Sequence, residues 1–286
     1  MSATSWRRLR IGGFLLLILL PVLIGLIGPL LAQLGPQTSQ APFGPSVWSP
    51  FGTDRLGRDV AVAALLGGRS LIVVTTATAV VTYAIGFVLG AIAATTQRRW
   101  IEELIMRPID VLLCLPSLLL IILAALYGKG SALAVAAAVG LASLAPIVRF
   151  VRMAARSSLH GPVMDALVLT GASWFTRYVR VGLRAMLRPV AADFGVRLSA
   201  MIYILASANF LGLGFDQTSP DWAVTVAANK DALLVSPGAV LVPAGLIVSL
   251  VVGINLLWDE LLRDPTGLAR QRALMQARAE QEGGRQ

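Results

Sequence analysis

The sequence predicts an all-α integral membrane protein with six transmembrane helices and both termini in the cytoplasm. Hydrophobic residues make up 56% of the 286 residues and mean hydropathy is +0.76, whereas charged residues make up only 14%. Soluble domains carry roughly 25% charged residues. The apolar residues gather in segments long enough to cross a bilayer core of about 30 Å. The basic residues fall unevenly in the loops between these segments.

Six apolar segments alternate with polar loops. The first follows Arg7, Arg8 and Arg10, is too long for the apolar region of a cleaved signal peptide, and has no A-x-A cleavage site after it. Pro116 and Pro146 fall inside later segments, where membrane helices tolerate proline if neighbouring groups satisfy the freed carbonyls. The predicted spans are 11–34, 70–95, 108–127, 131–150, 190–211 and 236–258.

The distribution of basic residues sets the orientation. With the N-terminus in the cytoplasm, eighteen Lys and Arg residues fall in the inside segments and five in the outside segments. An even number of spans returns the C-terminus to the cytoplasm. The chain then divides into an N-terminal tail, first span and external loop (1–69), a five-helix core (70–258) and a cytoplasmic C-terminal tail (259–286).

The most basic stretch is the central cytoplasmic loop at 149–189, whose only acid is Asp165. Gly161-Pro162 is a turn-and-start signal and Gly171 is a natural stop, so a first short helix is expected from Pro162 to Thr170. The loop is therefore predicted to contain defined secondary structure rather than to be a flexible linker.

A second helix is expected in the same loop. It begins after Ser173, a good N-cap residue, and ends at Arg188, just before Pro189. One of its faces is basic and the other apolar, as in a helix that lies at a membrane surface or against neighbouring helices. The basic face holds Arg177, Arg180, Arg184 and Arg188, and the apolar face Phe175, Val179, Leu183 and Met186.

Charged and sulfur-containing residues inside the spans are candidates for function. Asp193 and Arg197 lie four residues apart on one helix face, and an intramembrane charge is a functional candidate by default. We favour a self-neutralising pair near the cytoplasmic end, with Arg197 snorkelling. Cys114 lies in an apolar run and is expected to be a buried structural thiol. With one Cys and one His in the chain, a Cys/His metal site is not expected.

The first external loop has an irregular part and a charged part. Residues 35–50 are rich in Pro, Ser and Gly and predict irregular structure. The segment 51–60, FGTDRLGRDV, predicts a solvated turn that leads into a short surface helix. Local ion pairs are expected around Gly57, among Asp54, Arg55, Arg58 and Asp59.

Common catalytic motifs are absent from the sequence. There is no G-x-x-x-x-G-K-[ST] phosphate loop, so the chain does not bind ATP by that means. There is also no H-E-x-x-H and no G-x-S-x-G, so the common hydrolase signatures are missing.

Four stretches occur in an order that is characteristic of one family. They are FGTDRLGRDV (51–60), MRPIDVLLCLPSLLL (106–120), NFLGLG (209–214) followed by SPDW (219–222), and NLLWDELLRDP (255–265). Together they resemble the permease subunits of binding-protein-dependent ABC importers, most closely the second permease of the peptide/nickel branch.

The resemblance implies a type I ABC importer-like permease fold with a cytoplasmic coupling helix. The coupling motif of the family, E-A-A followed by Gly, is matched by Asp165-Ala166-Leu167 and Gly171. A short helix that docks in a groove of the ATPase needs small residues for close approach and an acid that can meet a cation. The residues expected to couple to the ATPase are Asp165, Ala166, Leu167, Gly171, Ala172 and Ser173.

The resemblance also implies the assembly. The expected partners are a second, different permease subunit, two ATP-binding cassette ATPase subunits, an extracytoplasmic substrate-binding protein and membrane lipid, without nucleic acid. ATP and magnesium would be bound by the ATPases, so no cofactor, metal or catalytic residue is expected in this chain. The expected location is the bacterial cytoplasmic (inner) membrane.

The function implied is ATP-driven import of a small solute, with di- or oligopeptides first and nickel or a metal–chelator complex second. A different class is an ATP-independent secondary transporter or channel. Such proteins usually need intramembrane ionisable residues, and this chain offers only Asp193, Arg197 and, near a span end, Asp110. For a membrane-embedded enzyme, the sequence shows no paired catalytic groups.

Overall fold

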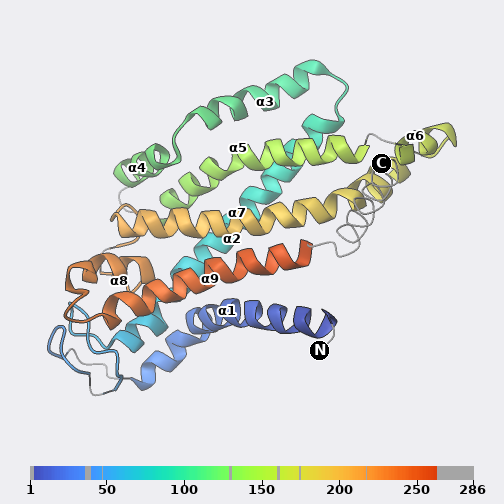
Figure 1. The fold of residues 1–286 in the computed structure, drawn as a ribbon. Helices are drawn as coiled ribbons and strands as arrows, with labels where there is room; N and C mark the ends of the chain where they lie inside the picture. The colour runs from blue at the N-terminus through green and yellow to red at the C-terminus, as the bar shows by residue number, and fades with distance from the viewer. Residues whose placement is uncertain are drawn as a thin grey trace, which may run out of the picture.

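The computed structural model describes residues 3–35, 40–46, 48–128, 131–159, 162–173, 175–216 and 218–262. Within these ranges the chain forms helices and loops, with one isolated β-bridge between Thr53 and Asp59. The longer helices form a bundle in which most run side by side and α2 crosses behind the others (Figure 1). They are α1 (Ala3–Leu31), α2 (Val60–Thr95), α3 (Arg99–Cys114), α4 (Ser117–Tyr127), α5 (Ala132–Leu159), α7 (Arg184–Phe210) and α9 (Gly238–Leu262). Shorter segments are η1 (Ala32–Leu34), α6 (Pro162–Leu169), the π-helix η2 (Thr176–Leu183), α8 (Trp222–Asn229) and η3 (Lys230–Ala232).

The prediction of six spans is confirmed, with one span built differently. Among the described residues, five helices are long and apolar enough to cross a membrane, and the bent pair α3–α4 makes a sixth. The two halves of that pair meet at 87°. We expected Pro116 to lie within a continuous helix, but the helix breaks there. The break arises because proline restricts the preceding residue, Leu115, to an extended backbone (ψ 125°). Pro146 does remain inside α5.

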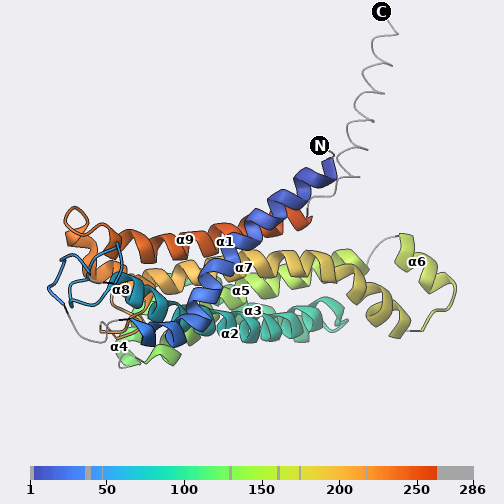
Figure 2. The same ribbon diagram turned by 90° about the horizontal axis from the view of Figure 1, so that it is seen from below.

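The helices place the loops at two opposite ends of the bundle (Figures 1 and 2). The start of α1, the end of α9 and α6 lie at one end, which we call the coupling end. The loop at 40–59, α4 and α8 lie at the other, which we call the outer end. The bundle thus separates α6 at the coupling end from the segment 51–60 and α8 at the outer end.

Two predicted element boundaries are wrong. Residues 60–69 are not a short surface helix but the first turns of α2, where Val60 and Ala63 are each 2% exposed. The helix expected to stop before Pro189 instead continues through it to Phe210. A proline removes one helical donor, and the helix continues because Met186 and Val190 on either side of it are buried in the bundle.

The core lies along α2, α5, α7 and α9 and reaches α8. Its largest fully buried side chains include Trp222, Leu71, Ile147, Met201 and Leu205. Trp222 packs against the backbone of α2, where a Cβ at Gly68 would overlap the indole ring. The outer end is therefore tightly packed as well as polar.

The prediction that Cys114 is buried is wrong. Cys114 is exposed at the end of α3, where its thiol donates to the carbonyl oxygen of Asp110 at 3.4 Å. Lipid tails are as apolar as the core of a protein. An apolar segment of a membrane protein therefore does not have to bury each of its side chains within the bundle.

Candidate coupling site and outer polar cluster

The predicted coupling helix forms close to its expected bounds, as α6 (Pro162–Leu169). Two nested hydrogen bonds close its C-terminus. The Gly171 N–H donates to the Val168 carbonyl and the Ala172 N–H donates to the Leu167 carbonyl, each at 3.0 Å. Gly171 has φ +71°. This left-handed residue after a helix end is the usual place for glycine, because a Cβ is strained there.

Ser173 begins the next helix, as expected. Its hydroxyl accepts a hydrogen bond from the Thr176 N–H at 3.3 Å, and its carbonyl accepts from the Arg177 N–H at 3.1 Å. The chain therefore passes from α6 through a defined turn at 170–172 into η2 and then α7.

The surface of α6 is largely uncovered. Asp165 and Ala166 are exposed and Leu167 is half-buried. Within the described chain, Asp165 makes no ion pair, although the same loop contains seven arginines. Apolar side chains are uncovered around it: Val163 is 67%, Val168 52% and Leu169 88% exposed. An acid surrounded by exposed apolar side chains has the chemistry of a protein-docking surface.

The second predicted helix has the expected basic face. Arg180, Arg184 and Arg188 are exposed, whereas Met186 on the opposite side is 5% exposed. Phe175 does not join the apolar contact and is exposed. The side chain of Val179 lies outside the described residues. His160, to which the sequence analysis assigned no role, also lies outside them.

Asp193 and Arg197 form the intramembrane pair that their spacing predicts. Arg197 Nη2 lies 3.3 Å from Asp193 Oδ1, and Arg197 Nε donates to Asp193 Oδ2 at 3.4 Å. The hydroxyl of Tyr83 on α2 lies 3.1 Å from Asp193 Oδ2 and 3.0 Å from the Val190 carbonyl oxygen. The contact with Tyr83 could not be predicted from the local sequence, because Tyr83 lies on a helix more than one hundred residues earlier in the chain.

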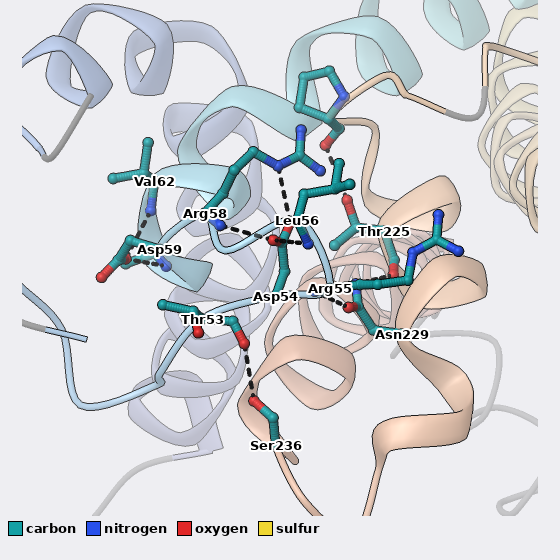
Figure 3. Close-up of polar contacts among 12 residues, drawn as sticks. Thr53, Asp54, Arg55, Leu56, Arg58, Asp59, Val62, Thr225, Asn229 and Ser236 are labelled. Atoms are coloured by element: carbon teal, nitrogen blue, oxygen red, sulfur yellow. Dashed lines mark hydrogen bonds and ion pairs between the residues drawn. The ribbon is translucent and has the colours of Figure 1, made fainter. Parts of the chain in front are cut away.

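At the outer end, Asp54 organises the turn in FGTDRLGRDV (Figure 3). Its carboxylate accepts hydrogen bonds from the N–H groups of Leu56 and Arg58 and pairs with Arg58 Nε at 2.9 Å. The predicted local ion pair is thus present. The turn is not solvated as expected, because Asp54 is 1% exposed.

Asp59 caps α2. One carboxylate oxygen accepts from the N–H groups of Ala61 and Val62, and the hydroxyls of Ser46 and Ser49 also donate to this carboxylate. An acid at this position satisfies donors that the first helical turn leaves free. The irregular loop before α2 is therefore held onto the helix start by its own serines.

The turn is also tied to distant parts of the chain. The Arg55 N–H donates to Asn229 Oδ1 at the end of α8, at 2.8 Å. The Ser236 hydroxyl donates to the Thr53 carbonyl at 3.2 Å, which holds the approach to α9 (Figure 3). These contacts join the first external loop to the last two helices.

Asp221 provides a second junction at the outer end. It is fully buried, caps α8 through the Ala223 N–H, and accepts from Ser70 at 2.9 Å and from Asn209 at 3.1 Å. Burial raises the pKa of Asp221 above the ordinary value of an aspartate. Trp222 beside it donates its indole N–H to the Ala64 carbonyl at 2.7 Å. The motifs around 209–214 and 219–222 therefore meet at Asp221, whereas the motif at 51–60 contacts the other end of α8 through Asn229.

Residues 86–258 match the family described as the binding-protein-dependent transport system inner membrane component. The match spans more than half of the chain. The chain belongs to this family. It is also 30% identical to the di/tripeptide transport system permease protein DppC of Pseudomonas aeruginosa (strain UCBPP-PA14), over 87% of this chain and 85% of that protein.

Two further relatives are glutathione transport system permease proteins named GsiD. The protein of Pectobacterium atrosepticum is 30% identical over 76% of this chain and 72% of its own length. The protein of Escherichia coli O6:K15:H31 is 31% identical over the same shares. The resemblance read from the four motifs is thus confirmed.

Membership of the family settles the class of protein. The chain is a multi-pass permease subunit of an ABC importer in the bacterial inner membrane, and it works with ATPase and binding-protein partners. ATP hydrolysis in this family is carried out by separate chains. The ATP-independent transporter or channel and the membrane-embedded enzyme are therefore not supported.

Proposed function

We propose that this chain is one of two different permease subunits that together line an import path for short peptides. The substrate class is supported by the names of its relatives, which are transport system permeases for di- and tripeptides or for glutathione, itself a tripeptide. Nickel or a metal–chelator complex, the second substrate class read from the sequence, is not favoured by these relatives.

The second permease follows from the number of docking elements. This chain carries one candidate coupling helix, whereas two ATPases closing on ATP present two docking grooves. A second permease supplies the other helix, and ATP and magnesium bind to the ATPases rather than to this chain.

The coupling element is α6, with Asp165, Ala166 and Leu167 on the helix and Gly171, Ala172 and Ser173 in the turn. The observation that carries this assignment is the position of α6, which projects beyond the bundle at the coupling end (Figure 2) with Asp165 exposed. Its motion reaches the spans through η2 and α7. Rigid-body rocking of spans in response to such a motion is a known form of domain closure.

Uptake by cells tests the substrate class. A strain that lacks this chain, and a strain complemented with it, are compared for uptake of a labelled dipeptide, labelled glutathione and labelled nickel. We expect complementation to restore uptake of one or both peptides and to leave nickel uptake unchanged. Restoration of nickel uptake alone would overturn the peptide assignment.

Purification in mild detergent tests the assembly. We expect the tagged chain to retain an ATPase and a second permease of different sequence. A homodimer of this chain that is competent for transport would contradict the proposal of two different permeases.

A further inference from the structure

The arginines at the coupling end fall into two groups. Arg107, Arg149, Arg152 and Arg156 each pair with a carboxylate on α3, and Arg10 pairs with Glu260. A second group has no ion-pair partner among the described residues and is exposed. It includes three arginines spaced four residues apart at the start of one span: Arg180, Arg184 and Arg188, here called the arginine stripe.

Within the part of the chain that the structure describes, no carboxylate pairs with the arginine stripe. The nearest acids along the chain are Asp165 on α6 and Asp193, and both carboxylate oxygens of Asp193 face Arg197. Asp165 is exposed and unpaired within the described chain. Among the described residues, no ion pair therefore neutralises the positive charge of the stripe.

The position of the stripe along the helix sets its depth in the membrane. Arg188 lies about 33 Å along α7 from Phe210, at roughly 1.5 Å per residue. A bilayer core is about 30 Å thick. Phe210 is at the outer end, so Arg188 falls at the inner boundary of the hydrocarbon, and Arg184 about one turn beyond it.

The apolar neighbours of the stripe fit the same boundary. Leu187, between Arg184 and Arg188, is 56% exposed. An exposed leucine beside exposed arginines suits an interface in which the apolar side chain contacts acyl chains and the guanidinium groups reach the headgroups. Guanidinium groups also match phosphate oxygens in two-point hydrogen bonding.

We propose that the arginine stripe is a binding surface for the phosphate headgroups of anionic phospholipids in the inner leaflet. The stripe lies on the helix that leads directly from the coupling turn into the membrane. Bound headgroups hold the start of α7 at the membrane surface, so that displacement of α6 acts on the span rather than on a loose helix end.

The test compares lipids retained by the full-length protein after purification from bacterial membranes in mild detergent. We expect the wild-type protein to retain more phosphatidylglycerol, relative to phosphatidylethanolamine, than the bulk membrane does. The triple change R180Q/R184Q/R188Q should lower this enrichment by at least roughly fivefold, because each basic contact at an anionic surface is worth about that factor. R180K/R184K/R188K, which keeps the charge, should retain most of it.

A matched control uses the exposed Arg98 and Arg99 at the same end of the bundle. R98Q/R99Q should leave the enrichment near the wild-type value. An equal loss in this control would show a general effect of charge and overturn the assignment to the stripe. Loss of ATPase retention in R180Q/R184Q/R188Q with unchanged lipid enrichment would assign the stripe to the ATPase and also overturn the proposal.

Discussion

The side-chain amide of Asn209 donates a hydrogen bond to the carboxylate of Asp221 across 3.1 Å, and both residues are fully buried at the outer end. The contact joins the end of α7 to the start of α8. Because Asp221 also accepts a hydrogen bond from Ser70 on α2, one carboxylate holds three helices together.

Replacement of Asp221 by alanine should destabilise the protein. The change removes the cap of α8 and leaves the buried amide of Asn209 and the half-buried hydroxyl of Ser70 without this acceptor. The expected loss is about 2–4 kcal/mol. Thermal unfolding of the purified protein in detergent, followed by tryptophan fluorescence, measures it.

Two variants control this experiment. Asp221→Asn keeps a side-chain oxygen for the cap and should lose less stability. Asp216→Ala removes an exposed acid from the same loop and should shift stability by no more than about 0.5 kcal/mol. Equal melting temperatures for Asp221→Ala and Asp216→Ala would contradict a central role for Asp221.

Asp165→Ala should weaken coupling without affecting membrane insertion. If Asp165 meets a cation of the ATPase, its loss removes a charge-assisted contact worth about 1.5–3 kcal/mol when desolvated. We expect lower ATP hydrolysis by the reconstituted complex in the presence of loaded binding protein. Glu103→Ala, at another acid of the coupling end, is the control, and wild-type stimulation in Asp165→Ala would remove α6 from the coupling mechanism.

Gly171→Val should impair coupling through the backbone. The structure places nothing within 4 Å of a Cβ at Gly171, so space within the subunit is not limiting, but φ +71° is strained for a β-branched residue. Substrate-stimulated ATPase activity should fall. Gly171→Asn should retain more activity, since Asn tolerates the left-handed conformation, and equal activities for the two variants would argue against a backbone effect.

A double-mutant cycle tests whether Asp193 and Arg197 form a stabilising pair. Asp193→Asn and Arg197→Gln should each destabilise the protein, because each leaves one unpaired charge in a span. The double variant should be less destabilised than the sum of the two single changes, by about 0.5–3 kcal/mol. Additive changes in melting temperature would show that the two side chains act independently.

Labelling with a membrane-impermeant thiol reagent tests the orientation. The background carries Cys114→Ser, since Cys114 is exposed. A cysteine at Thr218, exposed at the outer end, should react from outside, and one at Ser173, exposed at the coupling end, should not. The reverse pattern would overturn the predicted cytoplasmic termini.

The predictions that succeeded rested on local chemistry or on composition. Apolar segment length gave the spans, because a bilayer demands continuous apolar helix. Gly171 and Ser173 marked the end of one helix and the start of the next, since both roles depend on backbone geometry and nearest neighbours. The spacing of Asp193 and Arg197 placed them on one helix face for the same reason.

Other features depended on contacts between segments far apart in the chain. Asp54 and Asp59 belong to a polar segment, and local composition predicted a solvated turn. Both carboxylates are buried: the turn is tied to α8 and to the approach to α9, and Ser46 and Ser49 donate to Asp59. The prediction that Cys114 is buried was wrong for a different reason. Apolar neighbours in the sequence do not show whether a side chain faces the bundle interior or the lipid.

The sequence by itself determined the membrane class, the spans, the short helix at Pro162–Leu169 and the family. Only the tertiary structure decided that Tyr83 holds Asp193, that Asp54 and Asp59 are buried, and that Asp221 joins three helices. The physical reason is that helix periodicity, caps and hydropathy act within a few residues of the chain. A buried carboxylate is satisfied by whichever donors the packing of separate helices brings to it.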